Sequence, residues 1–96
     1  MFCKTFRTKL SDEGMVRFKQ FVKNEYKPLI SQQPGFKGVY FCVKENNEFN
    51  MIMLWEHEHN IHEWSDNPDH QKISAGIKDV FINEIFQDIY EVFEKF

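Results

Sequence analysis

Residues 36–55 read FKGVYFCVKENNEFNMIMLW and contain the clearest structural signal in this 96-residue chain. The two apolar runs, Phe36–Val43 and Phe49–Trp55, are rich in the aromatic and β-branched residues that favour strands. The polar segment Lys44–Glu48 between them is centred on Asn46-Asn47, a composition typical of turns. The stretch therefore predicts an antiparallel hairpin, which Pro34-Gly35 introduces with a turn of its own.

Two further elements are expected before the hairpin. The alternating side chains of Phe2–Thr8 predict a short strand. Ser11 then offers a helix-capping side chain followed by two acids, and apolar residues recur after it at helical spacing. These residues are Met15, Phe18, Val22, Tyr26 and Leu29. Pro28 is expected to bend this helix or to start a new turn, because its ring removes a hydrogen-bond donor.

The remainder of the chain predicts helices followed by a strand. His59–Trp64 has the pattern of a short helix and Pro68–Glu84 that of a longer one, with Pro68 dividing the two. Ile73, Ile77, Val80 and Phe81 share one face of the longer helix. Residues 82–96 fit helical spacing as well as alternation. The β-branched and aromatic density of Asp88–Phe93, and the need for a fourth strand, favour a terminal strand.

The order of these elements predicts an α+β fold. We expect residues 1–96 to form a single domain with a ferredoxin-like βαββαβ arrangement, in which helices cover one face of a four-stranded antiparallel sheet. In both runs of the hairpin the apolar residues are consecutive, which is typical of strands buried on both faces. Helices on one face leave the other face exposed, so we expect a homodimer that packs sheet against sheet.

Composition excludes several classes of protein. The net charge of −3 comes from interspersed charges without a basic block, which argues against nucleic acid as a partner. No run approaches the roughly 20 apolar residues that span a bilayer, and no secretory signal is recognisable. We therefore expect a cytoplasmic protein without a membrane partner. Cys3 and Cys42 lack the spacing of a zinc site, and we expect buried free thiols.

Three motifs together resemble the antibiotic biosynthesis monooxygenase (ABM) family of dimeric α+β barrel proteins. They are Pro34-Gly35-Phe36-Lys37-Gly38, Trp55-Glu56, and Trp64 followed by Asn67-Pro68-Asp69-His70. The resemblance implies one pocket per subunit, between the sheet and the helices. It also implies that a small aromatic compound, such as a quinol or a polyketide, is oxidised there by dioxygen without a metal or flavin cofactor. Some members of the family have no known activity, so a non-catalytic ligand-binding or structural dimer remains the alternative.

Six residues are candidates for this pocket. His70 has the ordinary pKa of a general base, although a surface histidine at a helix start is common. Trp64 suits stacking on a planar ligand and equally suits a core position. Arg7 is expected to pair with an acid or to meet an anionic substrate. The candidate catalytic residues are His70 and Trp64, and the candidate substrate-binding residues are Trp55, His57, Arg7 and Phe41.

Two alternative sites have weaker support. His57, His59 and His62 are close together, and histidine is a common metal ligand, but their spacing matches no established zinc site. The haem-degrading monooxygenases, which this sequence also resembles through Trp64, carry a haem-ligating histidine nine or ten residues later. This chain has Ile73 and Ser74 there, which argues against haem.

Overall fold

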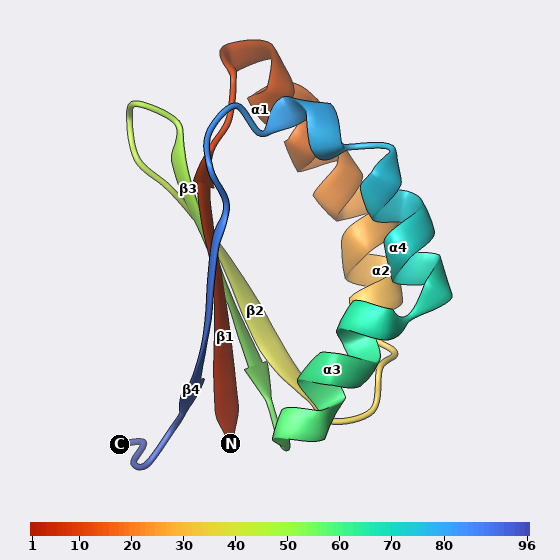
Figure 1. Cartoon of the computed structure of the whole chain (residues 1–96), viewed down its shortest axis with the longest axis vertical. Coiled ribbons are helices and arrows are strands. Elements are labelled where there is room, and N and C mark those ends of the chain that lie inside the picture. The colour runs from red at the N-terminus through yellow and green to blue at the C-terminus, as the bar shows by residue number, and fades with distance from the viewer.

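The computed structural model describes residues 1–96 as two layers, with a four-stranded antiparallel sheet on one side and helices on the other (Figure 1). Both termini lie at the same end of the sheet. The elements in chain order are β1 (Phe2–Lys9), α1 (Asp12–Phe21), a π-helical segment (Val22–Tyr26), α2 (Lys27–Ile30), β2 (Phe36–Val43), β3 (Glu48–Trp55), α3 (Glu58–Asp66), α4 (Pro68–Ala75), a 3-10 turn (Lys78–Val80) and β4 (Phe86–Glu91).

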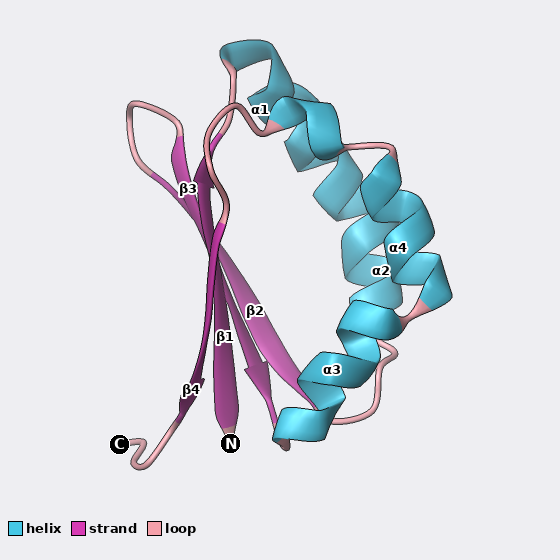
Figure 2. Cartoon of the chain, in the orientation of Figure 1, coloured by secondary structure: helices cyan, strands magenta, loops and turns pink.

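The strands are ordered β2-β3-β1-β4, so the first strand lies in the middle of the sheet beside the last one. In this register Lys4 of β1 lies opposite Met53 of β3 and Ile89 of β4. Figure 2 shows that all helices cover the same face and that the second face carries no element of this chain. The predicted ferredoxin-like α+β fold, with its antiparallel four-stranded sheet and terminal strand, is confirmed.

The central hairpin forms where the sequence predicts it. β2 and β3 pair from Val43 opposite Phe49 to Phe36 opposite Trp55, with a register shift between Phe36 and Gly38. Asn47 has a positive φ of 64°, a backbone conformation that asparagine tolerates better than most residues. The turn residues therefore close the hairpin in the register that the two apolar runs require.

The first helix begins as expected, and a π-helical turn that the sequence did not predict precedes Pro28. The Ser11 hydroxyl accepts a hydrogen bond from the Gly14 backbone N–H at 2.9 Å and so caps α1. Pro28 does not bend the chain away but lies in the first turn of α2, so the expected new turn at this residue is confirmed. The preceding turn, Val22–Tyr26, widens to π-helical hydrogen bonding, and Lys27 N–H bonds to Val22 O. Such a bulge accommodates the missing proline donor without breaking the helix.

The prediction of one helix over Pro68–Glu84 is wrong in its extent. α4 ends at Ala75, and the chain continues through a separate 3-10 turn, Lys78–Val80. Gly76 has a low helix propensity, and Ile77 leaves the helical region with φ −123°. Phe81 then forms an isolated bridge with Leu10. This early end leaves enough chain for β4 to return along β1.

The core lies between the sheet and the helices. Along β3 burial alternates, because every second side chain points to the helices. The buried apolar residues are Leu10, Phe18, Phe21, Tyr26, Ile30, Phe49, Met51, Met53, Trp55, Ile61, Trp64, Ile77 and Val80. The predicted burial of the two free thiols is wrong, because Cys3 is half-buried and Cys42 is exposed. None of the helices has the length and apolar character that crossing a bilayer requires.

Candidate functional site

Tyr26 lies at the centre of an aromatic cluster between the sheet and the helices. Its hydroxyl accepts a hydrogen bond from Trp64 Nε1 and donates one to Met53 Sδ, each at 3.4 Å. The rings of Phe41 and His70 stand edge-on to it, with centroids 5.8 and 5.9 Å away. Burial raises the pKa of the Tyr26 hydroxyl, so this group stays a neutral phenol at physiological pH.

His70 is held against Trp64 by both stacking and a hydrogen bond. The two rings are nearly parallel, at 12°, with centroids 3.9 Å apart, and His70 Nδ1 lies 2.8 Å from the backbone oxygen of Trp64. Because a carbonyl oxygen can only accept, Nδ1 carries the proton. The unprotonated nitrogen of the neutral ring is therefore Nε2, which can accept a proton from a ligand.

The position of His70 follows from the local sequence. The Asn67 side chain caps α4 by accepting hydrogen bonds from the backbone N–H groups of Asp69 and His70, at 2.9 and 3.1 Å. Pro68 occupies the first turn, where its missing donor costs nothing. His70 thus sits in the first turn of α4, directly beside the last turn of α3 that carries the Trp64 carbonyl.

The surroundings of His70 favour its neutral form. Burial is the main cause that lowers the pKa of His70 below its ordinary value, and the positive charge of Lys4 lowers it further. The hydrogen bond to Trp64 O acts in the opposite direction but does not prevail. At neutral pH the ring is therefore uncharged, with Nε2 as its basic nitrogen.

Lys4 extends from the central strand towards the helices. Its Nζ donates a hydrogen bond to the Ser65 hydroxyl of α3 at 3.3 Å. Burial lowers the pKa of Lys4. A cation thus shares the space between sheet and helices with the aromatic cluster.

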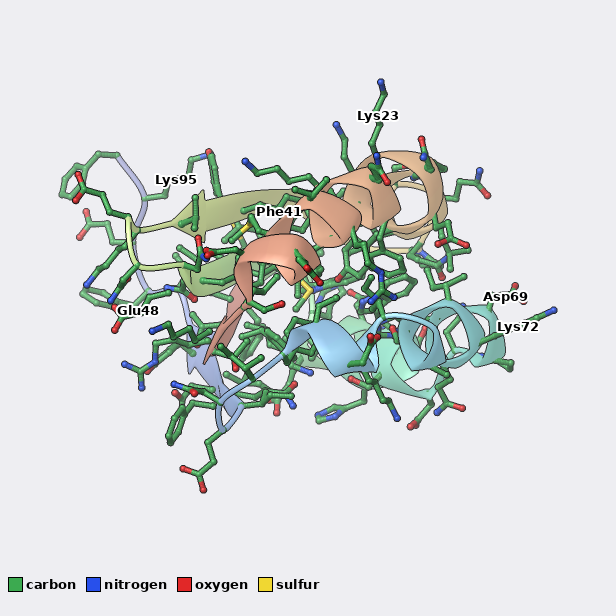
Figure 3. The ribbon with its side chains drawn as sticks, turned by 90° about the horizontal axis from the view of Figure 1, so that it is seen from above. Lys23, Phe41, Glu48, Asp69, Lys72 and Lys95 are labelled. Atoms are coloured by element: carbon green, nitrogen blue, oxygen red, sulfur yellow. The ribbon has the colours of Figure 1, made fainter.

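Trp55 and Phe41 complete the cluster from the sheet side. Trp55 is 0% exposed and packs against Trp64 and Phe36, with centroids 6.3 and 5.5 Å away. Its indole Nε1 is buried without a hydrogen-bond partner. Phe41 is half-buried, and Figure 3 places it in the middle of the molecule, whereas Lys72 of α4 points outward.

Arg7 and His57 lie away from this cluster. Arg7 points to the uncovered face of the sheet, where its guanidinium stands 5.2 Å from the centre of the Phe86 ring. It forms no ion pair, so the expected pairing with an acid is not found. β3 ends at Trp55, and His57 is an exposed residue that precedes α3, so the strand does not carry it to the helix-facing side.

The alternative sites are not assembled in the structure. His59 and His62 each lie near an exposed glutamate on α3, Glu63 at 3.6 Å and Glu58 at 3.5 Å. No group of three or more potential metal ligands is present. Haem does not fit the cluster either. Ile73 and Ser74 occupy the positions where a haem-ligating histidine is expected, and the ring of His70 is stacked against Trp64.

The main hollows of the surface touch the aromatic cluster only at Phe41. One of about 630 Å³ is at the hairpin end of the sheet and includes Arg7, Asn50 and Phe86, and one of about 130 Å³ lies between α1 and β2. Neither reaches Trp64 or His70. The side chains of Tyr26, Met53 and Trp55 fill the space beside these two residues, in contrast to the expected open pocket.

Sequence patterns do not identify two members of the cluster. Tyr26 belongs to the helical stripe of apolar residues and resembles an ordinary core position. Lys4 carried a usable signal, since it alternates with Phe2 and Phe6 and so shares their face of the strand. Its contact with Ser65 joins residues 61 positions apart, which no local pattern predicts.

Comparisons with known proteins agree on the architecture. The antibiotic biosynthesis monooxygenase family model matches residues 1–76. A candidate antibiotic biosynthesis monooxygenase from Deinococcus radiodurans has a TM-score of 0.84 and 14% identity, over 100% of this chain and 96% of that chain. SnoaB, a cofactor-independent oxygenase from Streptomyces nogalater, has a TM-score of 0.76 and 11% identity, over 98% and 94%. No curated protein matches the chain. At these identities the solved structures show a shared fold.

Proposed function

The chain belongs to the antibiotic biosynthesis monooxygenase family, and from this membership we propose that it is a monooxygenase. The proposed substrate is a small planar aromatic compound of quinol or polyketide type, oxidised by dioxygen without a metal or flavin. SnoaB, which shares the fold, is a cofactor-independent oxygenase. The proposed catalytic residues are His70 and Trp64, with Trp55 and Phe41 as aromatic walls.

One observation carries the proposal, namely the fixed tautomer of a neutral, half-buried His70. The hydrogen bond from Nδ1 to Trp64 O leaves Nε2 as the basic nitrogen, and burial keeps the ring uncharged. A general base needs a free lone pair and a pKa near or below the working pH, and His70 meets both conditions. Trp64 stacks on the imidazole and holds its orientation.

The chemistry needs only a base, dioxygen and exclusion of water. For a substrate with an activated methylene group, His70 Nε2 removes one proton and leaves a delocalised carbanion. The carbanion gives its electrons to dioxygen and forms a carbon–peroxide bond, which the imidazolium protonates. Loss of water from this hydroperoxide breaks the O–O bond, releases the second C–H proton and yields a ketone, so that the methylene group and dioxygen become a carbonyl group and water. A dry site protects the carbanion from protonation by solvent.

We propose that a ligand reaches His70 by passing over β1 and β4. On the helix-facing side of the central strand, Phe2, Lys4 and Phe6 are only half-buried, and Ile89 of β4 is 40% exposed. The helices therefore cover this half of the sheet less completely than the half formed by β2 and β3. A planar ligand entering here meets Lys4 and the edge of the aromatic cluster.

A non-catalytic dimer is the second candidate function. The observation in its favour is the tight packing of the cluster, since Trp64 is 1% exposed and Trp55 is 0% exposed. If these side chains fill the site permanently, the chain acts as a binding or structural module. Activity measurements separate the two candidates.

We also propose that the uncovered face of the sheet binds a second copy of the chain. Tyr40, Phe86 and Tyr90 are 63%, 48% and 55% exposed on this face. Together with the half-buried Ile52 and Leu54 they form an apolar surface of a kind that usually marks an interface. A self-complementary interface there creates the dimeric barrel.

Oxygen uptake with a panel of quinols and anthrones tests the proposal. We expect uptake with wild-type protein and a loss of about a hundredfold or more in His70→Asn, because general-base catalysis contributes about this much. Asparagine keeps an N–H group for Trp64 O but has no basic nitrogen. The matched control is His62→Asn on the exposed side of α3, which should retain the wild-type rate. Absence of uptake with every compound sinks the enzyme proposal and leaves the non-catalytic dimer.

A further inference from the structure

Lys4 is a cation on the apolar face of the central strand. It lies between Phe2 and Phe6 on the same side of β1, and its partners across the sheet are Met53 and Ile89. Lys4 is half-buried on this face, and partly removing an ammonium from water has a cost that a negative charge would offset. The side chain reaches α3 instead of turning to the uncovered face.

The structure gives this ammonium no carboxylate partner. Every ion pair in the molecule is formed by other residues, and the one side-chain hydrogen bond of Lys4 goes to the neutral Ser65 hydroxyl. Glu91, the acid on the helix-facing side of β4, lies opposite Phe2 rather than Lys4. An ammonium has three N–H donors. Two of them remain available for acceptors that the chain does not supply.

A second donor in the same layer also lacks an acceptor. Trp55 lies opposite Phe2, one step along the sheet from the Lys4–Met53 pair, and its buried indole N–H has no partner. Buried polar groups are normally hydrogen-bonded, so the unpartnered indole N–H of Trp55, close along the sheet to the unpaired charge of Lys4, indicates a place for an acceptor. The imidazole of His70 does not supply the missing negative charge, because at neutral pH the ring is uncharged.

We propose that Lys4 is the anion-binding residue of the site and that the ligand is an aromatic oxyanion, a phenolate or an enolate, whose oxygen lies against Lys4 Nζ. This inference rests on the proposed monooxygenase function and narrows its substrate class. The unpaired donors fit an oxygen acceptor, and the charge of Lys4 fits an anion. The aromatic walls fit the ring that carries the oxygen.

The same contact has a chemical consequence for the reaction. When His70 removes a proton from the substrate, negative charge spreads onto the oxygen of the conjugated system. A cation fixed at that oxygen stabilises the charge as it develops, which is the most effective placement for electrostatic catalysis. Arg7 cannot take this role, because it lies on the opposite face of the sheet over Phe86.

Binding of 4-nitrophenol tests the proposal without requiring turnover. Its phenolate is coloured, so absorbance reports the ionisation of the bound ligand directly. We expect wild-type protein to bind the phenolate in preference to the uncharged methyl ether, 4-nitroanisole. Lys4→Met should weaken phenolate binding about tenfold or more, the usual value of a charge-assisted hydrogen bond, and should leave binding of the ether unchanged. Lys4→Arg should retain most of the preference.

Lys72→Met is the matched control, since it removes an outward-pointing lysine of α4 and should bind as wild type does (Figure 3). The proposal is overturned if Lys4→Met binds the phenolate as tightly as wild type. In that case the aliphatic part of the Lys4 side chain packs on apolar surface and its ammonium group is solvated by water. The proposal is equally overturned if wild-type protein binds the phenolate no better than the ether, a comparison that needs no variant to fold.

Oxygen uptake, measured separately, distinguishes failure of this inference from failure of the proposed function. Preferential binding of the phenolate without any oxygen uptake would support the anion site and contradict the proposed monooxygenase function. Oxygen uptake that Lys4→Met does not change would support the monooxygenase function and contradict the proposed role of Lys4.

Discussion

The two faces of the sheet both carry large apolar side chains but have opposite surroundings. On the helix-facing side of β3, the side chains of Phe49, Met51, Met53 and Trp55 are at most 7% exposed. On the other side of the same strand Ile52 and Leu54 are only half-buried, and on β2 and β4 large aromatic side chains are largely exposed. The open face also carries polar side chains such as Arg7 and Asp88, but the main difference between the two faces is what covers them.

This contrast separates two sources of stability. The covered face is buried by helices of the same chain, so its contribution to the free energy of unfolding is independent of protein concentration. The open face can bury its apolar area only against another molecule, so its contribution depends on concentration. A small domain buries only a modest share of its surface by itself, so burial of the open face against another molecule can add substantially to its stability.

The largest expected effect comes from removing a side chain of the covered face. Trp55→Ala should lower the free energy of unfolding by about 3–5 kcal/mol, because the indole is fully buried between Trp64 and Phe36. Tyr40→Ala, on the open face, should change it by less than about 1 kcal/mol in dilute solution. Urea denaturation at low protein concentration measures both. Equal losses would mean that the two faces do not differ in the isolated chain.

A charge on the open face gives the next largest effect. Ile52→Asp should weaken self-association by about a hundredfold or more, because a buried, unpaired carboxylate in an apolar interface costs several kcal/mol. Val16→Asp on the exposed side of α1 is the matched control and should leave association unchanged. Sedimentation velocity over a range of concentrations measures the dissociation constant. A monomeric wild-type protein, or association that Ile52→Asp does not alter, removes the proposed interface.

Much of the fold was predictable, because local periodicity records which side of each element is buried. The bounds of the hairpin strands and the start of the first helix follow from apolar spacing, capping and turn residues. The end of α4 was not predictable in this way. Ile77, Val80 and Phe81 continue the helical spacing beyond Gly76, and tertiary contacts, including the bridge from Phe81 to Leu10, determine the actual path.

The candidate site was predictable only in part. Trp55, Trp64, His70 and Phe41 do gather in one cluster, whereas Arg7 and His57 lie elsewhere. The face of Arg7 depends on the register of β1, which one residue of shift would invert. The partners of Lys4 and Tyr26 come from distant segments of the chain, and sequence spacing contains no information about such contacts.

The smallest expected effect concerns the titration of His70 on the covered face. Lys4 of β1, Tyr26 of the π-helical segment and Trp64 of α3 face this ring, and none supplies a negative charge at neutral pH. Burial lowers the pKa of His70 below its ordinary value of 6.5, so NMR should place the midpoint of its ring titration below that value. Replacing Lys4 by methionine should raise the midpoint, because a repulsive charge is removed.

The same shift fixes the sign of the dependence of stability on pH. Above pH 6.5 both the folded and the unfolded chain carry a neutral His70, and stability is at its full value. As the pH falls below 6.5 the unfolded chain binds a proton first, so the free energy of unfolding decreases until the pH passes the folded pKa. His70→Asn should lose this component, and the difference between the two proteins in denaturation experiments isolates it. A ring midpoint at or above 6.5 would show that His70 is a solvated histidine, and the covered face would then contain no neutral base to perform the proposed chemistry.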